Sequence, residues 1–457
     1  MFSNWLVGGY LAEVMTEAEE KRGSQAGCRR EDALAVVRRL REMGHVAYFA
    51  GGCVRDVLLG LEPTDWDVAT DAEPRRVREL FRNTQAVGAV FGVILVRQGQ
   101  SVVEVATFRS DAEYVDGRRP TGVRFTTAEE DAQRRDFTIN GLFLDPLEGD
   151  RVIDYVGGVE DLRSRHLRAI GEAGKRFAED HLRLLRAVRF AARFGLEFDG
   201  GTAEAIKRNG PFLKRISPER IGEELRLMLT AGTRGAAWEL LWEFGLVEVI
   251  WRFLPVKEGE KFEGARSIFL AMGAGEEVAF GLALAAGTLC VKRQGMGAGE
   301  DIRGLLGKRD VQQMVKAMQQ ALKISNEESE QMQGTLEGIG PLLADERPGV
   351  ARMKRFLASQ TAGLSRRLLG AMQGGGLFVE RIEWLAGQLG ELEKGEFAPL
   401  PLITGDDLTA VGLRPGPMFK RILERVYDGQ LEGRVKDREE AMRMAMEMGS
   451  EKGKTRG

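Results

Sequence analysis

The sequence predicts an α/β N-terminal head followed by an all-α neck, body and tail. Short runs rich in valine follow one another early in the chain, among them WDVAT, GVILVRQ and SVVEVATF. The last run alternates apolar and polar residues, which is typical of a strand with one buried face. From Arg163 onward the strand signals fade, and apolar residues recur at helical spacing almost to the C-terminus.

The length of 457 residues exceeds one ordinary domain, and an apolar content of 43% is sufficient for several cores. We divide the chain into five segments. These are an N-terminal extension (1–30) without an assignable role, a head (31–165), a helical neck (166–255), a helical body (256–385) and a tail (386–457). The head opens on a predicted amphipathic helix at about 31–44, with Ala33, Val36, Val37 and Leu40 on its apolar side.

Charge and cysteine content narrow the functional class. The 66 Lys and Arg residues nearly balance 69 Asp and Glu, so net charge neither favours nor excludes a nucleic-acid partner. Cys28, Cys53 and Cys290 are far apart, which excludes a zinc ribbon and a disulfide scaffold and fits a reducing cytosol. No window approaches the ~20 apolar residues of a membrane span, and the N-terminus lacks the basic region of a signal peptide. We therefore expect a cytoplasmic protein without a membrane partner.

A glycine pair marks the first candidate site. The run VAYFAGGCVRDVLLG predicts a strand, a turn at Gly51 and Gly52, and the start of a helix. Such a turn allows backbone N–H groups to approach a polyphosphate, and the helix dipole favours the same anion. Arg55 supplies positive charge for these phosphates.

Acidic residues follow at a spacing that suits metal binding. Asp65 and Asp67 are two positions apart, so on a strand their side chains share one face. Mg²⁺ prefers a few carboxylates completed by water and substrate phosphates. Two such ions about 3.5–4 Å apart activate a hydroxyl and stabilise a leaving pyrophosphate. Glu104, in VVEVATF, is either a third catalytic carboxylate on a neighbouring strand or a charged residue on an exposed strand face.

Five segments, in order, resemble the motifs of the class II tRNA nucleotidyltransferases, a family within the DNA polymerase β-like superfamily that includes CCA-adding enzymes and bacterial poly(A) polymerases. The segments are GGCVRDVLLG with TDWDVAT, RRDFTINGLFLDP, DYVGGVEDL, AEDHLRLLRAVRFAARFG and SPERIGEELRLML. Between the first two, FRSDAEYVDGRRPTGVRF resembles the flexible loop of the family. The resemblance covers about residues 31–255 closely and the C-terminal segment more loosely.

The resemblance implies a role for each matching residue. It implies Mg²⁺ binding by Asp65 and Asp67, and it implies nucleotide contacts for the remaining motif residues. Those residues are Gly51, Gly52 and Arg55 at the phosphates, Arg135, Asp136 and Asn140 at the ribose or phosphates, and Asp180, Arg183, Arg186 and Arg189 in the nucleotide pocket.

Base selection can be argued from the fourth motif itself. Asp180 and Arg183 are three positions apart, which makes them neighbours on a helix. A carboxylate accepts from an exocyclic amine, whereas a guanidinium donates to a ring nitrogen or carbonyl. Cytosine and adenine both present an amine beside an acceptor, so this pair is predicted to accept them and to reject uracil and guanine. Arg183, Arg186 and Arg189 step by three along the same ridge, and Arg189 approaches the apolar side of the helix.

The flexible-loop segment runs into the second motif without a gap, as in the CCA-adding type. The resemblance therefore implies addition of C, C and A to the 3′ end of tRNA from CTP and ATP. The alternatives are an A-adding enzyme, a poly(A) polymerase and a catalytically dead RNA-binding relative. The sequence carries no feature that specifies an oligomeric state.

Two C-terminal regions complete the interpretation. Helices in the body resemble those of a metal-dependent HD phosphohydrolase, but its histidines are missing, and Leu289 and Cys290 stand where a His-Asp pair is expected. We predict no such activity there. The segment from Ile403 to Gly433 resembles a tRNA-contacting tail, in which Gly416 and Pro417, after Arg414, start a helix.

Overall fold

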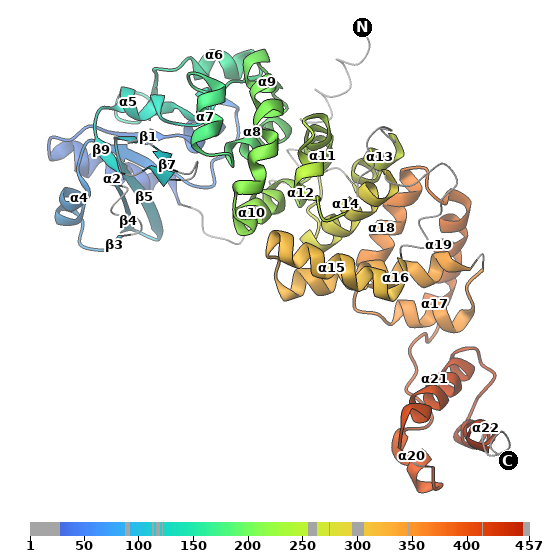
Figure 1. Ribbon diagram of the computed structural model, residues 1–457. Helices are drawn as coiled ribbons and strands as arrows, with labels where there is room; N and C mark the ends of the chain where they lie inside the picture. The colour runs from blue at the N-terminus through green and yellow to red at the C-terminus, as the bar shows by residue number, and fades with distance from the viewer. Residues whose placement is uncertain are drawn as a thin grey trace. The chain divides into compact units, whose positions relative to one another are not determined.

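The computed structural model describes residues 28–86, 92–111, 114–115, 119–120, 122–254, 263–273, 275–294, 306–345, 347–413 and 415–450. The chain forms two compact units (Figure 1). The first runs to Arg252 and includes a short later segment at 275–277, and the second contains Phe253–Gly273 and the chain from Val278 onward. Among the described residues, no helix combines the length and apolarity needed to cross a bilayer.

The first unit is built on a seven-stranded mixed sheet, as predicted for an α/β head. Its order is β11-β10-β1-β2-β5-β4-β3, and β2 and β5 are its one parallel pair among the described residues. The strands are β1 (Ala47–Ala50), β2 (Val68–Thr70), β3 (Thr84–Ala86), β4 (Val93–Gln98), β5 (Ser101–Thr107), β10 (Leu142–Asp145) and β11 (Arg151–Asp154).

One face of the sheet is covered by α2 (Arg30–Glu42), which contacts β1, β2, β4 and β5. The four residues predicted to form its apolar side are all buried. Ser101, Val103, Val105 and Thr107 of β5 are also buried, while Val102 and Glu104, between them, are exposed. The alternation in the sequence therefore separates a core face from a face that is open to ligands.

The strand–glycine–helix prediction is confirmed. β1 ends at Ala50, Gly51 takes a φ of +73°, and α3 (Gly52–Leu58) begins at the next residue. Further helices and short hairpins surround the sheet. They are α4 (Pro74–Leu80), β6 (Arg109–Asp111) with β9 (Val123–Phe125), β7 (Tyr114–Val115) with β8 (Arg119–Pro120), α5 (Ala128–Gln133), the 3-10 helix η2 (Thr138–Asn140) and α6 (Gly158–Arg163).

The remainder of the first unit is mostly helical. It comprises α7 (Ala173–Glu179), α8 (Arg183–Phe194), α9 (Gly200–Asn209), η3 (Gly210–Arg215), α10 (Pro218–Leu229), α11 (Arg234–Glu243) and α12 (Leu246–Ile250). One departure from the expected all-helical run is a parallel pair formed by β12 (His166–Leu167) and β13 (Glu197–Phe198). These strands have two residues each, which is too short for a periodic signal in the sequence.

The second unit is helical throughout its described residues. It contains α13 (Glu263–Ala271), α14 (Phe280–Gln294), α15 (Lys308–Leu322), α16 (Asn326–Ala344), α17 (Val350–Leu357), α18 (Ala362–Gly374), α19 (Val379–Glu393), α20 (Gly405–Ala410), α21 (Pro417–Leu431) and α22 (Arg438–Ser450). Leu289 and Cys290 are buried in α14. The tail has a small core of its own, which includes Ile403, Leu408, Ile422 and Val426. As predicted, α21 begins at Pro417, whereas Arg414 and the predicted boundary at 255/256 lie outside the described residues.

Candidate functional site

A pocket of about 620 Å³ in the first unit gathers nearly all of the predicted site residues. Twelve of the thirteen line it, and Asp65 does not. Arginines outnumber carboxylates nine to four in the lining, so the pocket suits a strongly anionic ligand. The carboxylates are Asp67, Glu104, Asp136 and Asp180, and the arginines are Arg55, Arg109, Arg134, Arg135, Arg183, Arg186, Arg189, Arg193 and Arg220.

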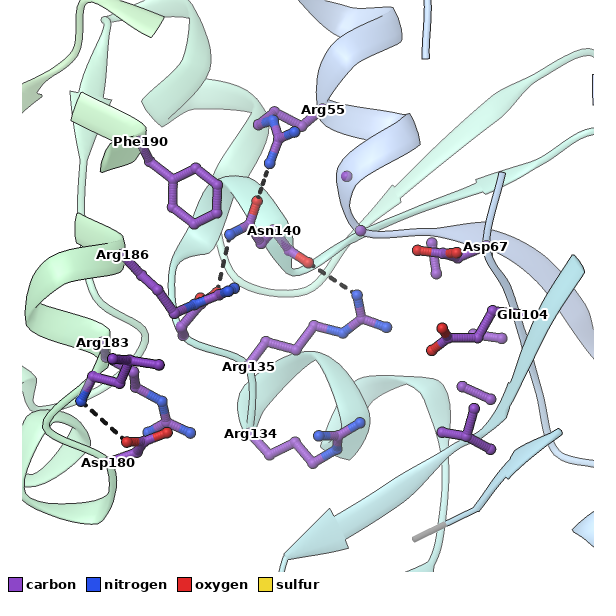
Figure 2. Close-up of a pocket in the computed structure, with 18 of the residues that line it drawn as sticks. Arg55, Asp67, Glu104, Arg134, Arg135, Asn140, Asp180, Arg183, Arg186 and Phe190 are labelled. Carbon is purple, nitrogen blue, oxygen red and sulfur yellow. Dashed lines mark hydrogen bonds and ion pairs between the residues drawn. The ribbon is translucent and has the colours of Figure 1, made fainter. Parts of the chain in front are cut away.

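Asp67 and Glu104 form the acidic wall of this pocket (Figure 2). Val68 of β2 pairs with Val105 of β5 in parallel, so the residues that precede them lie next to each other on the same face. Burial, together with the charges of Glu104 and then Asp65, raises the pKa of Asp67 to about 7. Although Glu104 as a residue remains exposed toward the pocket, partial desolvation of its carboxylate raises its pKa against the opposing charge of Arg109.

The expected strand around the two aspartates begins later than predicted. Asp65 and Asp67 lie in the extended segment before β2, which starts at Val68. Between them, Trp66 is buried with its ring centroid 4.7 Å from that of Phe49. The alternation that the prediction relied on is thus present, but Asp65 is exposed and outside the pocket lining.

These carboxylates fit a divalent cation in part. No group of three or more His, Cys, Asp or Glu side chains within the described ranges is arranged to hold a metal ion by itself. Asp67 and Glu104, with the charge of Asp65 close enough to raise both pKa values, suit Mg²⁺, which completes its shell with water and phosphate oxygens. Asp67 and Glu104 would hold such an ion at the pocket wall, with Asp65 beside them.

The glycine turn is packed against the arginine wall. A Cβ built on Gly51 would lie 2.9 Å from Nη1 of Arg135, and its backbone conformation is one that side-chain-bearing residues rarely adopt. Arg55 of α3 is buried, and its guanidinium donates to Oδ1 of Asp56 (2.6 and 2.8 Å) and to Oδ1 of Asn140 (2.7 Å). Arg55 thus lines the pocket with its guanidinium already bonded to two side chains, and the phosphate contact expected from the sequence stays a prediction.

Asn140 and Arg186 form a hydrogen-bond network around the buried carboxylate of Asp136. Asn140 donates from Nδ2 to Oδ1 of Asp136 at 3.0 Å, and Arg186 donates to Oδ2 of Asp136 at 2.7 and 2.8 Å. Burial alone would raise the pKa of Asp136, but Arg186 and Asn140 lower it to about 2. The network joins the segment around η2 to α8. The sequence placed these three residues in one site without predicting that they bind one another.

Arg134 and Arg135 are both anchored by Asp131 of α5, at 2.7 and 3.0 Å respectively. Arg135 also donates from Nη1 to the backbone carbonyl of Asn140 at 3.0 Å. Only Arg135 was predicted as a site residue. The doublet Arg134-Arg135 in RRDFTIN was the available signal for the second arginine, because one buried carboxylate holds both side chains at the pocket wall.

The predicted helical pairing of Asp180 with Arg183 is wrong. Asp180 follows the last residue of α7 with a φ of −148°, and α8 begins only at Arg183, so the two residues do not belong to one helix. Asp180 pairs with Arg220 at 2.7 Å, and Arg183 pairs with Glu179 at 2.6 Å. Leu182 donates its backbone N–H to Oδ1 of Asp180 at 3.0 Å, a local bond that turns the chain into α8.

Two residues of α10 that contact site residues were missed, Arg220 in the pocket lining and Glu224 outside it. Glu224 accepts from Arg189 at 2.7 Å, and Arg220 reaches Asp180 from the same helix. The segment SPERIGEELRLML contains both and was identified as a motif, but nothing in its spacing indicated which of its side chains face α8. Arg189 lies in the pocket as predicted, with its guanidinium 4.5 Å from the centroid of the Phe190 ring.

Two family descriptions match the chain, almost entirely within the first unit. Residues 47–168 match the "Poly A polymerase head domain", and residues 195–256 match the "Probable RNA and SrmB- binding site of polymerase A". Poly(A) polymerase I of Escherichia coli O157:H7 is 44% identical over 229 residues, which is 48% of this chain and 49% of that protein. The CCA-adding enzyme of Geobacillus stearothermophilus is 43% identical over 217 residues, which is 47% of this chain and 53% of that protein. The chain thus matches about half the length of these curated relatives.

Solved structures extend the likeness beyond the first unit. The Bacillus stearothermophilus CCA-adding enzyme in complex with CTP is 28% identical, with a TM-score of 0.62, and the match covers 93% of this chain and 98% of that one. The Thermotoga maritima CCA-adding enzyme complexed with tRNA_CCA has a TM-score of 0.63 at 17% identity, which is a likeness of fold alone.

Proposed function

We propose that this chain, which matches the poly A polymerase head domain over residues 47–168, belongs to the family of bacterial poly(A) polymerases and CCA-adding enzymes and adds C, C and A to the 3′ end of tRNA. CTP and ATP are the substrates, and no nucleic-acid template is used. The observation that carries the proposal is one pocket with two carboxylates on one wall and a cluster of arginines opposite.

In this proposal, Asp67 and Glu104 are the carboxylates that hold Mg²⁺ beside the reacting groups. The RNA 3′ hydroxyl attacks the α-phosphorus of the nucleotide, the bond to the bridging oxygen breaks, and pyrophosphate leaves. Mg²⁺ bound there would assist the loss of the hydroxyl proton and neutralise phosphate charge. The raised pKa of Asp67 supports this role, because carboxylates crowded without a cation favour the binding of one.

The arginine wall holds the triphosphate. Arg134 and Arg135 are fixed by Asp131, so they present donors without reorganising when the nucleotide binds. The buried Asp136 and Asn140, held by Arg186 and Arg55, offer polar groups to the ribose. Guanidinium groups held in place in this way bind phosphate more strongly and more directionally than exposed lysines do.

Base choice is assigned to Asp180 and Arg183, which both line the pocket. The Asp180 carboxylate accepts from the exocyclic amine of cytosine or adenine, and the Arg183 guanidinium donates to the adjacent ring nitrogen. A base with the reverse order leaves buried polar groups unpaired, which costs roughly 1–3 kcal/mol for each group. The tail, including α21, is assigned to contact with the tRNA backbone.

The choice of CCA addition over poly(A) addition rests on two observations. The match to a solved CCA-adding enzyme extends over 93% of this chain, and the segment that resembles the flexible loop continues unbroken into the second motif. Poly(A) addition is the second candidate, because poly(A) polymerase I is as similar over about half of this chain as the CCA-adding relatives are.

One assay separates the candidates. Purified protein is given tRNA transcripts that end before C, before the second C or before A, with Mg²⁺ and with CTP and ATP alone or together. We expect addition of CC from CTP and of a single A when ATP is also present. Long A tails on any RNA would establish poly(A) addition, and A addition to the CC-ended transcript alone would establish an A-adding enzyme. Binding of tRNA without incorporation of any nucleotide would identify a catalytically dead relative.

A further inference from the structure

We propose that Arg220 is a positioning residue that sets base selectivity by holding the Asp180 carboxylate in its base-reading orientation. The proposal rests on the proposed function, in which Asp180 accepts the amine of the incoming base. Arg220 lies on α10, is absent from the site residues predicted from the sequence, and lines the same pocket as Asp180.

The contact is a two-point fork. Nη1 of Arg220 donates to Oδ1 of Asp180 at 3.2 Å, and Nη2 donates to Oδ2 at 2.7 Å. Two parallel bonds between a planar guanidinium and a planar carboxylate fix both the position and the plane of the acid. Their side chains are 26% and 17% exposed, so the pair is partly shielded from solvent.

The position of Asp180 in the chain explains why such support is needed. Asp180 follows the last residue of α7 and has an extended backbone, so its side chain is not fixed by packing within a helix. Within the described part of the chain, the other hydrogen bond to its carboxylate is a local one, from the backbone N–H of Leu182 to Oδ1. Without Arg220, a single bond would leave the carboxylate free to rotate about its side-chain torsions.

Counting acceptors shows what remains for the base. Oδ1 receives two donors, from Leu182 and Arg220, while Oδ2 receives one from Arg220. Each carboxylate oxygen accepts about two hydrogen bonds, so Oδ2 keeps capacity for an exocyclic amine. The fork therefore leaves one acceptor site at a defined place in the pocket, which an amine can use and a carbonyl oxygen cannot.

Arg183 is held separately, by Glu179 at 2.6 Å and by the backbone carbonyl of Arg176 at 2.8 Å. The acceptor and the donor of the proposed base-reading pair thus have distinct supports on different elements. Loss of Arg220 should affect the reading of the amine and leave the support of Arg183 in place.

The test compares Arg220→Ala and Arg220→Lys with the unaltered protein in single-nucleotide addition to a tRNA that lacks its 3′ end. Initial rates are measured separately for CTP, ATP, UTP and GTP. We expect the ratio of kcat/KM for CTP to that for UTP to fall about tenfold or more in Arg220→Ala, equivalent to about 1.4 kcal/mol. Arg220→Lys should give an intermediate ratio, because it keeps the charge and loses the fork.

Arg151→Ala is the matched control, since Arg151 forms an ion pair with Glu148 at 2.8 Å outside the pocket lining. Thermal unfolding midpoints show whether each variant is folded. An unchanged selectivity ratio with a lower kcat for all four nucleotides would reduce Arg220 to a structural role. A lower KM for CTP with unchanged selectivity would indicate that Arg220 competes with the base for the Asp180 carboxylate. Either result overturns the proposal.

Asp180→Ala is assayed in parallel so that the two proposals can fail separately. If Asp180→Ala leaves selectivity unchanged, base reading by Asp180 is wrong, and the inference about Arg220 is overturned with it. If Asp180→Ala lowers selectivity and Arg220→Ala does not, only the inference about Arg220 is overturned. If both act through one carboxylate, the double variant should be no less selective than Asp180→Ala alone.

Discussion

Asp136 and Arg186 form an ion pair of 2.7 Å that joins the segment before η2 to α8. The carboxylate is 9% exposed and the guanidinium 35%, so the pair is shielded mainly on its acidic side. A shielded ion pair contributes to folding, so its effect can be measured without any substrate.

The first prediction is that Asp136→Asn destabilises the protein at pH 7 by about 2 kcal/mol. Breaking a fully buried ion pair costs roughly 3–5 kcal/mol, and the cost here should be lower because the Arg186 side chain reaches solvent. The pKa of Asp136 is lowered to about 2 in the folded protein, so its stabilisation is present above the ordinary pKa of 3.8. The stabilisation is lost as pH falls from there toward 2. Calorimetric unfolding at pH 7 and pH 3 should show a smaller difference between variant and wild type at the lower pH, and an equal or larger difference at pH 3 would contradict the assignment.

The second prediction concerns catalysis by the acidic wall. Asp67→Asn and Glu104→Gln should each reduce nucleotide addition by at least about 100-fold, since even residues that only orient metal ligands typically contribute 10–100-fold. Glu62→Gln, an exposed acid outside the pocket lining, is the control and should retain activity. Full activity of Glu104→Gln would show that Glu104 is a charged residue on an exposed strand face without a catalytic role.

The third prediction is that Asp67→Asn is more stable than the wild type when metal is removed. The folded pKa of Asp67 is raised to about 7, so stability from its protonated form is present below pH 3.8 and is lost as pH rises through about 7. With EDTA at pH 8, the variant should therefore unfold at a higher temperature, and the gap should narrow at pH 5. Added Mg²⁺ should raise the midpoint of the wild type more than that of the variant, and equal shifts would argue against metal binding by Asp67.

The fourth prediction tests the glycine turn. Gly51→Ala introduces a side chain at a φ of +73° and within 2.9 Å of Arg135, so we expect a loss of about 1–3 kcal/mol in stability. The apparent KM for CTP should rise as well, because Arg135 must move to admit the methyl group. Gly60→Ala is the matched control, since Gly60 also has a positive φ (+74°) but no atom within 4 Å of the position that a Cβ would take. It should lose stability without a change in KM, and an equal rise in KM there would show that the effect is not local.

The fifth prediction is that Asp180→Ala loses base choice more than tRNA affinity. Removing the acceptor from a half-buried position should reduce discrimination between CTP and UTP by about 10–100-fold, the equivalent of roughly 1–3 kcal/mol. Filter binding of tRNA should change little, because Asp180 lies in the nucleotide pocket. A large loss of tRNA binding with intact selectivity would move Asp180 out of the proposed role.

Much of the head could be predicted from local patterns. The apolar side of α2, the strand before Gly51 and the alternation in β5 each depend on residues close in sequence, and the structure confirms them. Apart from Asp65, the predicted site residues also line one pocket.

Partnerships between distant side chains could not be predicted in the same way. The spacing of Asp180 and Arg183 suggested a helical pair, but a helix end between them separates the two and gives each another partner. Arg55 was assigned to phosphate from its charge and from the family resemblance, and neither indicated that its buried guanidinium binds Asp56 and Asn140. Such pairings depend on how helices pack, and sequence periodicity specifies which face is buried without specifying what it meets.

The parallel pairing of β2 with β5 has a consequence for how the head tolerates change. The separation of Asp67 from Glu104 depends on the backbone ladder that joins Val68 to Val105, and not on the length of chain that connects the two strands. Insertions or deletions in the loops of that connection, outside α4, β3 and β4, should therefore be neutral for the geometry of the acidic wall, whereas a one-residue slip of β5 would turn Glu104 to the opposite face. The head is accordingly a scaffold in which loops can diverge or be engineered while the reactive groups keep their spacing.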